Sequence, residues 1–205
     1  MKLVVLGATG HTGREIVDLA LARGHEVTAY VRSPQKIQRA DSRLIVQQGD
    51  ALDVNRLSSI LAHHDAVLSA LGLPARQALR PSTFMAESAA SIALAMKRAD
   101  VNRLAIVSAA VLFPADGLFY AFFRRLLKHH ARDLSAMETV VQATELDWTV
   151  ARPPRLVHAT DENRRVVSGA LPDRGYSLSF RALAAFLLDC VEANSYLREV
   201  VGVAR

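Results

Sequence analysis

Three glycines near the start of the chain form the pattern that most clearly points to chemistry. The segment Gly7–Gly13, with the sequence GATGHTG, follows a short apolar run and opens a helical pattern. In such a segment the first glycine permits a tight turn, the second lets the backbone approach a pyrophosphate, and the third lets helix and strand pack closely. The N–H groups and the dipole of the helix then face the anion. The alternative is a turn with a purely structural purpose. The pattern predicts a dinucleotide site made by Gly7, Thr9, Gly10, His11, Thr12 and Gly13.

The residue that ends the next apolar run bears on which dinucleotide binds. An NAD site usually carries Asp or Glu about 20 residues after the glycines, where it holds the ribose hydroxyls. Residues 29–34 read AYVRSP and contain no carboxylate, and Arg32 follows Gly13 by 19 residues. A guanidinium here suits a 2′-phosphate, to which Ser33 and Lys36 could add donors. We expect NADP(H) rather than NAD(H), with a solvated Arg32 as the alternative.

A third candidate segment for the cofactor, Gly49–Leu52, follows the next apolar run. Asp50 could accept a hydrogen bond from the exocyclic amine of adenine, with Leu52 against the ring. Asp50 could equally cap the following helix, which requires no ligand. Both alternatives stay open, and Asp50, Ala51 and Leu52 are candidate cofactor residues.

Apolar runs and helical patterns alternate along the chain, and the apolar runs are buried-strand patterns with no polar face. This is typical of a parallel sheet covered by helices on both sides. We therefore expect residues 1–205 to form one α/β domain with a doubly wound parallel sheet, the Rossmann arrangement. Loops at about 73–81, 111–118 and 153–177 are expected on the ligand side. The predicted strands are Lys2–Leu6, Val27–Val31, Leu44–Val46, Ala66–Ser69, Arg103–Val107, Trp148–Ala151 and Glu199–Val203, and the predicted helices are Thr12–Arg23, Val54–Ala62, Ser82–Arg98, Phe119–Thr144 and Phe180–Glu192.

Composition and charge exclude several classes of protein. The 205 residues are 51% hydrophobic and 22% charged, so the chain can build a core and is not disordered as a whole. The net charge of +5 comes from scattered residues, which argues against nucleic acid as the main partner. No apolar run is long enough for a bilayer, and the N-terminus lacks a signal-peptide core. We expect a cytoplasmic protein without a membrane partner.

The cysteine and histidine content gives no support to a metal site. Cys190 is the single cysteine, so one chain can form neither a disulfide nor a thiolate zinc site. The histidine pairs at 63–64 and 129–130 are adjacent in sequence, and adjacent side chains on a helix point about 100° apart. We expect no bound metal.

Several segments together resemble one family. The sequence is similar to the atypical short-chain dehydrogenase/reductases of the NmrA-like group, and within it to the flavin reductase/biliverdin-IXβ reductase type. The resemblance covers nearly the whole chain and is more specific for fold and cofactor than for substrate. It rests on Gly7–Gly13, Val31-Arg32, Gly49-Asp50, Ser69–Gly72, Arg76–Phe113 and Leu146–Pro153.

The resemblance implies roles on the cofactor side of the site. Ser108 matches the active-site serine or threonine of the family. Leu71 and Gly72 would line the path of the cofactor's ribose and phosphates. Arg76 matches an arginine in the loop over the cofactor, and Pro153 begins the paired prolines near the nicotinamide end.

On the substrate side the resemblance is weaker. Phe113 lies where the flavin reductase type has a tryptophan beside the substrate. The histidine that follows the paired prolines in that type is Arg155 here, so the resemblance does not carry the identity of the substrate. We expect Phe113 and Arg155, with Leu112 and Phe119, to form a wall of the substrate site.

The proton donor of ordinary family members is a tyrosine whose pKa is lowered by a lysine four residues on. Counted forward from the active-site serine, Tyr120 is followed at that spacing by Arg124. Counted backward from Glu138, the tyrosine and lysine positions hold His130 and Leu134. The backward count is preferred, because no insertion separates Glu138 from the next strand. The alternatives are Tyr120, His130, or neither, in which case solvent or the substrate supplies the proton.

Two functions follow from these expectations. The first is an NADPH-dependent oxidoreductase that transfers a hydride to a planar conjugated small molecule such as a flavin, a quinone or a linear tetrapyrrole. The second is a non-catalytic NADP(H)-sensing regulator or scaffold, as the NmrA-like group also contains, which would bind a protein partner.

Overall fold

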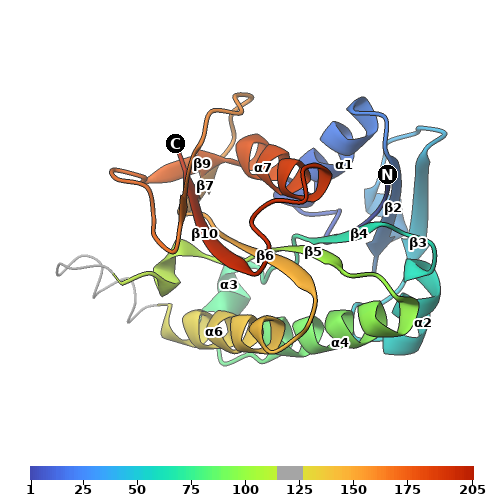
Figure 1. Cartoon of the computed structure of the whole chain (residues 1–205), viewed down its shortest axis with the longest axis horizontal. Helices are drawn as coiled ribbons and strands as arrows, with labels where there is room; N and C mark the ends of the chain where they lie inside the picture. The colour runs from blue at the N-terminus through green and yellow to red at the C-terminus, as the bar shows by residue number, and fades with distance from the viewer. Residues whose placement is uncertain (115–126) are drawn as a thin grey trace.

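The computed structural model describes residues 1–114 and 127–205, which form a central sheet between two layers of helices (Figure 1). Ten strands lie in the described part: β1 Lys2–Leu6, β2 Glu26–Val31, β3 Leu44–Gln48, β4 Ala66–Ser69, β5 Arg103–Val107, β6 Asp147–Arg152, β7 Arg155–Val157, β8 Arg165–Ser168, β9 Ser177–Ser179 and β10 Glu199–Ala204. Its helices are α1 His11–Ala22, α2 Val54–Leu61, α3 Ala75–Ala78, α4 Phe84–Ala99, α6 Lys128–Gln142 and α7 Phe180–Glu192, with short 3-10 turns η1 Pro34–Lys36 and η2 Ala110–Leu112.

The main sheet has eight strands in the order β3-β2-β1-β4-β5-β6-β10-β8. All its neighbours are parallel except β8, which pairs antiparallel with β10. From β1 the chain winds outward to β2 and β3, and then returns to place β4 on the other side of β1. Such a reversal leaves a crevice outside the carboxyl ends of the strands, where open α/β sheets bind their ligands. The expected doubly wound α/β fold is confirmed.

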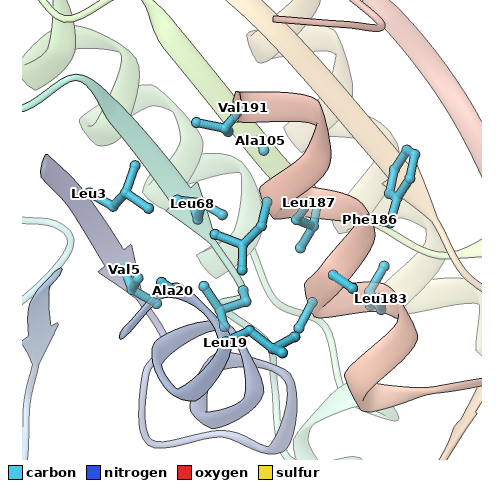
Figure 2. Packing of buried hydrophobic residues seen from close by; sticks show 14 of the residues in the cluster. Leu3, Val5, Leu19, Ala20, Leu68, Ala105, Leu183, Phe186, Leu187 and Val191 are labelled. Atoms are coloured by element: carbon cyan, nitrogen blue, oxygen red, sulfur yellow. The ribbon is translucent and has the colours of Figure 1, made fainter. Parts of the chain in front are cut away.

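Helices α1 and α7 pack side by side on one face of the sheet. Figure 2 shows Leu19 of α1 with Leu183 and Leu187 of α7 gathered over Val5 and Leu68 of the sheet. All five side chains are at most 5% exposed. Burial of an aliphatic side chain contributes about 1.5–3 kcal/mol, so this layer holds the start of α1, and with it the glycine loop, firmly against β1.

Helices α2, α4 and α6 cover the opposite face. Leu57, Ile92 and Met137, one from each helix, are fully buried against Val4 and Leu104 of the sheet. This layer matters for the site because it brings one face of α6 to the carboxyl ends of β4 and β5.

The segment expected to be one long loop, 153–177, is the main correction to the predicted elements. It contains β7 and β8 and leads into β9. β8 adds an edge to the main sheet, and β7 pairs with β9 in a separate two-stranded sheet. These strands have only three or four residues, and their partners lie far along the chain, so no local periodicity marks them. The predicted helix 119–144 is found from Lys128 to Gln142, and its first part lies outside the described residues.

The start of α2 decides between the two alternatives for Asp50. The N-cap of this helix is Asp53, whose carboxylate accepts a hydrogen bond from Arg56 N at 3.0 Å. The alternative in which Asp50 caps the helix is therefore wrong.

In the described part of the chain, no helix is both long and apolar enough to cross a membrane.

Candidate active site

A cleft of about 560 Å³ opens at the carboxyl ends of β1, β2, β4 and β5. It brings together residues of the three segments that the sequence singled out, together with the serine after β5 and one face of α6. Its lining includes Gly7, Thr9, Gly10, His11, Thr12, Tyr30, Arg32, Ser33, Lys36, Gly49, Asp50, Ala51, Leu71, Gly72, Phe84, Met85, Ser108, His130, Leu134, Leu156 and Phe180.

The glycine loop is built so that only glycine fits at two positions. Gly7 has a φ of +78°, and a Cβ there would collide with the carbonyl of Ala70. A Cβ on Gly13 would lie 2.7 Å from the Cα of Ala8 and closer still to the Gly7 carbonyl. The backbone of the loop therefore lies directly against the backbone of Ala70, which follows β4, and the start of α1 packs directly against the loop. A pyrophosphate-binding turn requires this close packing.

The first turn of α1 is left open for an anion. Gly10 is its N-cap, and no side chain of the described residues caps it. The N–H of Arg14 bonds to the Gly10 carbonyl at 3.0 Å, and the N–H of Gly10 bonds to the Gly7 carbonyl at 2.9 Å. Between them, the N–H groups of His11 and Thr12, two residues that line the cleft, have no backbone partner among the described residues. Uncapped N–H groups together with the helix dipole favour a phosphate. The residues present thus fit the pyrophosphate of a dinucleotide.

Arg32, Ser33 and Lys36 lie together at one end of the cleft, after β2 and in η1. None of the ion pairs formed within residues 1–114 and 127–205 involves Arg32 or Lys36, whereas Arg39 pairs with Asp18 at 3.0 Å. Both cations are therefore available to an anionic group in the cleft.

Beside this cationic end, Tyr30 and Asp50 form part of the wall. The Tyr30 hydroxyl donates to the Asp50 carbonyl at 3.2 Å, and Asp50 Oδ1 accepts from Leu52 N at 3.0 Å. A Cβ on Gly49 would collide with the Tyr30 ring, so glycine there leaves room for the tyrosine. Burial raises the pKa of the Tyr30 hydroxyl, which stays a neutral donor. Leu52 is 40% exposed and lies outside the lining.

Ser108 connects the cleft to a buried ion pair. Its hydroxyl donates to Glu138 Oε1 at 2.5 Å. Arg152 donates through Nε to the same oxygen at 2.9 Å and through Nη2 to Oε2 at 2.6 Å. The Arg152 guanidinium also lies 4.6 Å from the centre of the Phe113 ring. The side chain of Glu138 is 4% exposed, so this pair sits behind the serine rather than in the cleft.

The cleft face of α6 carries His130 and Leu134, the positions that the backward count assigned to the tyrosine and lysine. Four-residue spacing puts both on the same side of the helix as Glu138. Burial lowers the pKa of the His130 imidazole, partly opposed by the charge of Asp133. The Asp133 carboxylate itself accepts from Met85 N and Ala86 N at 3.2 and 3.1 Å, and so caps α4.

Acid should therefore destabilise the protein in part through His130. Its folded-state pKa is lowered, so the unfolded state binds more protons, and stability present above the unfolded value of about 6.5 is lost as pH falls below it. We expect the urea midpoint to fall less between pH 7.5 and 5 in His130→Gln than in the wild type. His64, whose pKa burial also lowers, contributes equally to both proteins. Parallel midpoint-against-pH curves would contradict the assignment.

Two aromatic rings, those of His11 and Phe180, line another part of the cleft, and the exposed ring of His158 packs against both. His11, in the glycine loop, lies edge-on to His158 at 4.6 Å between ring centres, and 5.0 Å from Phe180. His158 and Phe180 are 4.9 Å apart. These rings come from α1, the segment after β7, and the start of α7, so the unpredicted small sheet positions part of the site.

Some predicted site residues lie outside the lining. Gly13 is buried behind the loop, and Pro153 is buried with its carbonyl accepting from Ala110 N at 2.8 Å. Phe113 is 6% exposed and packs under Arg152, and Arg155 is exposed on β7. Tyr120, with Phe119 and Arg124, lies outside the described residues, and Arg76 lies in α3 with a side chain that is not described.

Sequence reasoning missed Phe180 and Leu156 in the lining of the cleft, His158 packed against Phe180, and Phe84 and Met85 at the start of α4. The first three follow or belong to strands too short to be predicted. The signal for the α4 residues was present, because the start of a helix after a sheet strand faces the ligand edge.

Known proteins resemble this chain in sequence. The sequence model of an NAD(P)H-binding family matches residues 7–194. The oxidoreductase stcQ of Emericella nidulans is 29% identical over 217 residues, covering 93% of this chain and 77% of that protein. The uncharacterized protein YwnB of Bacillus subtilis is 32% identical over 111 residues, covering 54% of this chain and 48% of that protein.

Solved structures share the fold. A short-chain dehydrogenase/reductase of Veillonella parvula in complex with NADP has a TM-score of 0.81 at 19% identity, covering 100% of this chain and 94% of that one. SP1627 of Streptococcus pneumoniae, described as an NADH-flavin reductase candidate, has a TM-score of 0.79 at 22% identity, covering 100% and 99%. At these identities the likeness shows the fold alone.

Proposed function

Because the chain belongs to the NAD(P)H-binding family, we propose that it is an NADPH-dependent reductase that transfers a hydride to a planar conjugated acceptor. The observation that carries the cofactor assignment is the placement of Arg32 and Lys36, without carboxylate partners among the described residues, in the cleft that holds the glycine loop. Bidentate guanidinium contacts are the usual recognition of a phosphate. The overall likeness to an oxidoreductase, stcQ, supports a redox role.

In this proposal different residues of the cleft bind different parts of the cofactor. The open first turn of α1 binds the pyrophosphate, and Arg32 with Ser33 and Lys36 holds the 2′-phosphate. Asp50 and Tyr30 flank the adenine. Leu71 and Gly72 line the path to Ser108, where the nicotinamide end lies. Bound NADPH supplies the hydride.

The acceptor site follows from what lies past Ser108. Leu134, Leu156 and Phe180 offer apolar surface, and His130 offers a polar edge. Apolar walls with few polar groups suit a planar conjugated molecule. The protein's work is then to hold acceptor and nicotinamide in contact and to exclude water between them. Phe113 and Arg155 stay predictions for the outer wall of this site.

The proton that accompanies the hydride comes from solvent in this account. Leu134 occupies the position of the family's lysine and carries no charge to activate a neighbouring donor. His130 is held neutral at pH 7 because burial lowers its pKa, so few molecules carry the proton there.

The test is the absorbance at 340 nm of NADPH, and separately of NADH, mixed with the protein and riboflavin, menadione or biliverdin. We expect loss of absorbance with NADPH and at least one acceptor, well above the rate with heat-denatured protein. No loss with any acceptor, in protein shown by fluorescence to bind NADPH, would count against a reductase.

One observation favours a second candidate, a non-catalytic NADP(H) sensor. The two positions of the tyrosine–lysine pair are occupied by His130 and Leu134, and both face the cleft. A sensor would bind NADPH and NADP⁺ with clearly different affinities and release a protein partner when the redox state changes. The 340 nm assay, combined with Kd values for both cofactor forms, separates the two candidates.

A further inference from the structure

The orientation of the Ser108 hydroxyl restricts what this residue can do in the cleft. Ser108 is 6% exposed and lines the cleft at the end of β5. Its single proton is given to Glu138 Oε1 at 2.5 Å. A hydroxyl has one proton and two lone pairs, so Ser108 presents only lone pairs to a ligand.

Glu138 cannot reverse this orientation, because Arg152 engages both of its oxygens. Arg152 Nε and Nη2 donate to Oε1 and Oε2 at 2.9 and 2.6 Å. A carboxyl group that accepts a bidentate guanidinium is ionised and has no proton to offer the serine. Arg152 is in turn held against the Phe113 ring.

We propose that Glu138 and Arg152 are positioning residues that hold Ser108 as a hydrogen-bond acceptor toward the cleft, so that the site selects conjugated acceptors that present a ring N–H. This proposal rests on the proposed function and narrows its substrate class to imides and lactams, such as an isoalloxazine or a lactam-bearing tetrapyrrole. A quinone presents only carbonyl oxygens, and these meet the lone pairs of Ser108 unfavourably.

Equilibrium binding tests this without turnover. Protein saturated with NADP⁺ is titrated into riboflavin and into 3-methylriboflavin, which lacks the imide N–H, and flavin fluorescence is followed. In the wild type riboflavin should bind about tenfold more tightly than its methylated analogue, the usual value of one lost hydrogen bond to a buried partner. Ser108→Ala should remove this difference by weakening riboflavin alone.

The Glu138→Gln variant tests the positioning role. The amide oxygen of the glutamine accepts from Arg152, and its amide N–H donates to the Ser108 hydroxyl oxygen. The Ser108 hydroxyl then points its own proton into the cleft. We expect riboflavin to lose about tenfold in affinity, and menadione, measured by competition, to bind more tightly than it does to the wild type. Glu145→Gln is the matched control, because that side chain is 95% exposed. If Glu138→Gln fails to fold, Ser108→Ala still tests whether Ser108 selects acceptors that present a ring N–H.

Three outcomes would overturn the inference: equal binding of the two flavins by the wild type, no binding of either, or a loss in Ser108→Ala that is the same for both. The outcomes separate from those of the reductase proposal. Selective flavin binding without NADPH oxidation would contradict the reductase proposal and support the selection of ring N–H groups by Ser108. Oxidation of NADPH together with equal binding of the two flavins would support the reductase proposal and contradict the selection by Ser108.

Discussion

Replacing Arg32 by alanine is expected to raise the Kd of NADPH about 30-fold and to leave the Kd of NADH within a factor of two. A hydrogen bond to a charged group contributes about 1.5–3 kcal/mol, and each 1.4 kcal/mol is tenfold in affinity. Only NADPH carries the 2′-phosphate that Arg32 would bind. Titration calorimetry or nicotinamide fluorescence measures both constants.

The matched control is Arg43→Ala, which removes an arginine paired with Asp41 at the opposite end of β3 from the cleft. We expect no change for either cofactor. In the wild type the NADPH affinity should also fall with salt more steeply than the NADH affinity, because the contact is ionic. An equal rise in the Kd of NADPH and of NADH in Arg32→Ala would contradict the assignment of Arg32 to the 2′-phosphate.

Replacing Arg103 by methionine is expected to lower the free energy of unfolding by about 3–5 kcal/mol. Three carbonyls lose a charged donor, and a hydrogen bond to a charged group contributes about 1.5–3 kcal/mol. Part of this loss is offset because methionine, unlike the guanidinium, has no charge to desolvate. Arg103 is 6% exposed, and burial lowers its pKa. Its guanidinium donates to the carbonyls of Asp147, Cys190 and Ser195 at 2.7, 2.7 and 2.8 Å. It thereby joins β5, β6 and the end of α7, and methionine would leave these carbonyls without their donor.

Urea unfolding of the cofactor-free protein measures the effect. Arg103→Lys keeps the charge but cannot reach all three carbonyls, so it should lie between the wild type and Arg103→Met. The control Arg39→Met removes an exposed pair with Asp18 and should cost less than about 1 kcal/mol. A urea midpoint for Arg103→Met like that of Arg39→Met would show that the hydrogen bonds of Arg103 add little to the free energy of unfolding.

The sequence predicted the parts of this molecule that depend on local pattern. The strand–glycine–helix transition at Gly7–Gly13 and the alternation of apolar runs gave the fold, because each is encoded within some 30 residues. The cleft collects Arg32, Ser33, Asp50, Ser108 and His130 as expected, because all but one follow strand ends that meet at one edge of a parallel sheet.

The parts that could not be predicted depend on distant partners. Nothing local shows that Glu138 meets Arg152, which lies 14 residues on in the next strand, or that the pair backs Ser108. The same holds for β7 and β9, whose pairing brings His158 and Phe180 to the glycine loop. Asp50 was ambiguous because two aspartates three residues apart both suit a helix cap, and only the structure shows that Asp53 takes it.

The most direct test of the reductase assignment is a single turnover under anaerobic conditions, with the protein in excess over NADPH and with riboflavin present. We expect the 340 nm absorbance of NADPH and the 450 nm absorbance of the flavin to decay at one rate, and deuterium at the transferred position of the nicotinamide to slow both. If the NADPH absorbance persists while binding is complete, and biliverdin and menadione give the same result, the protein does not transfer a hydride to these acceptors, and the sensor takes the place of the enzyme.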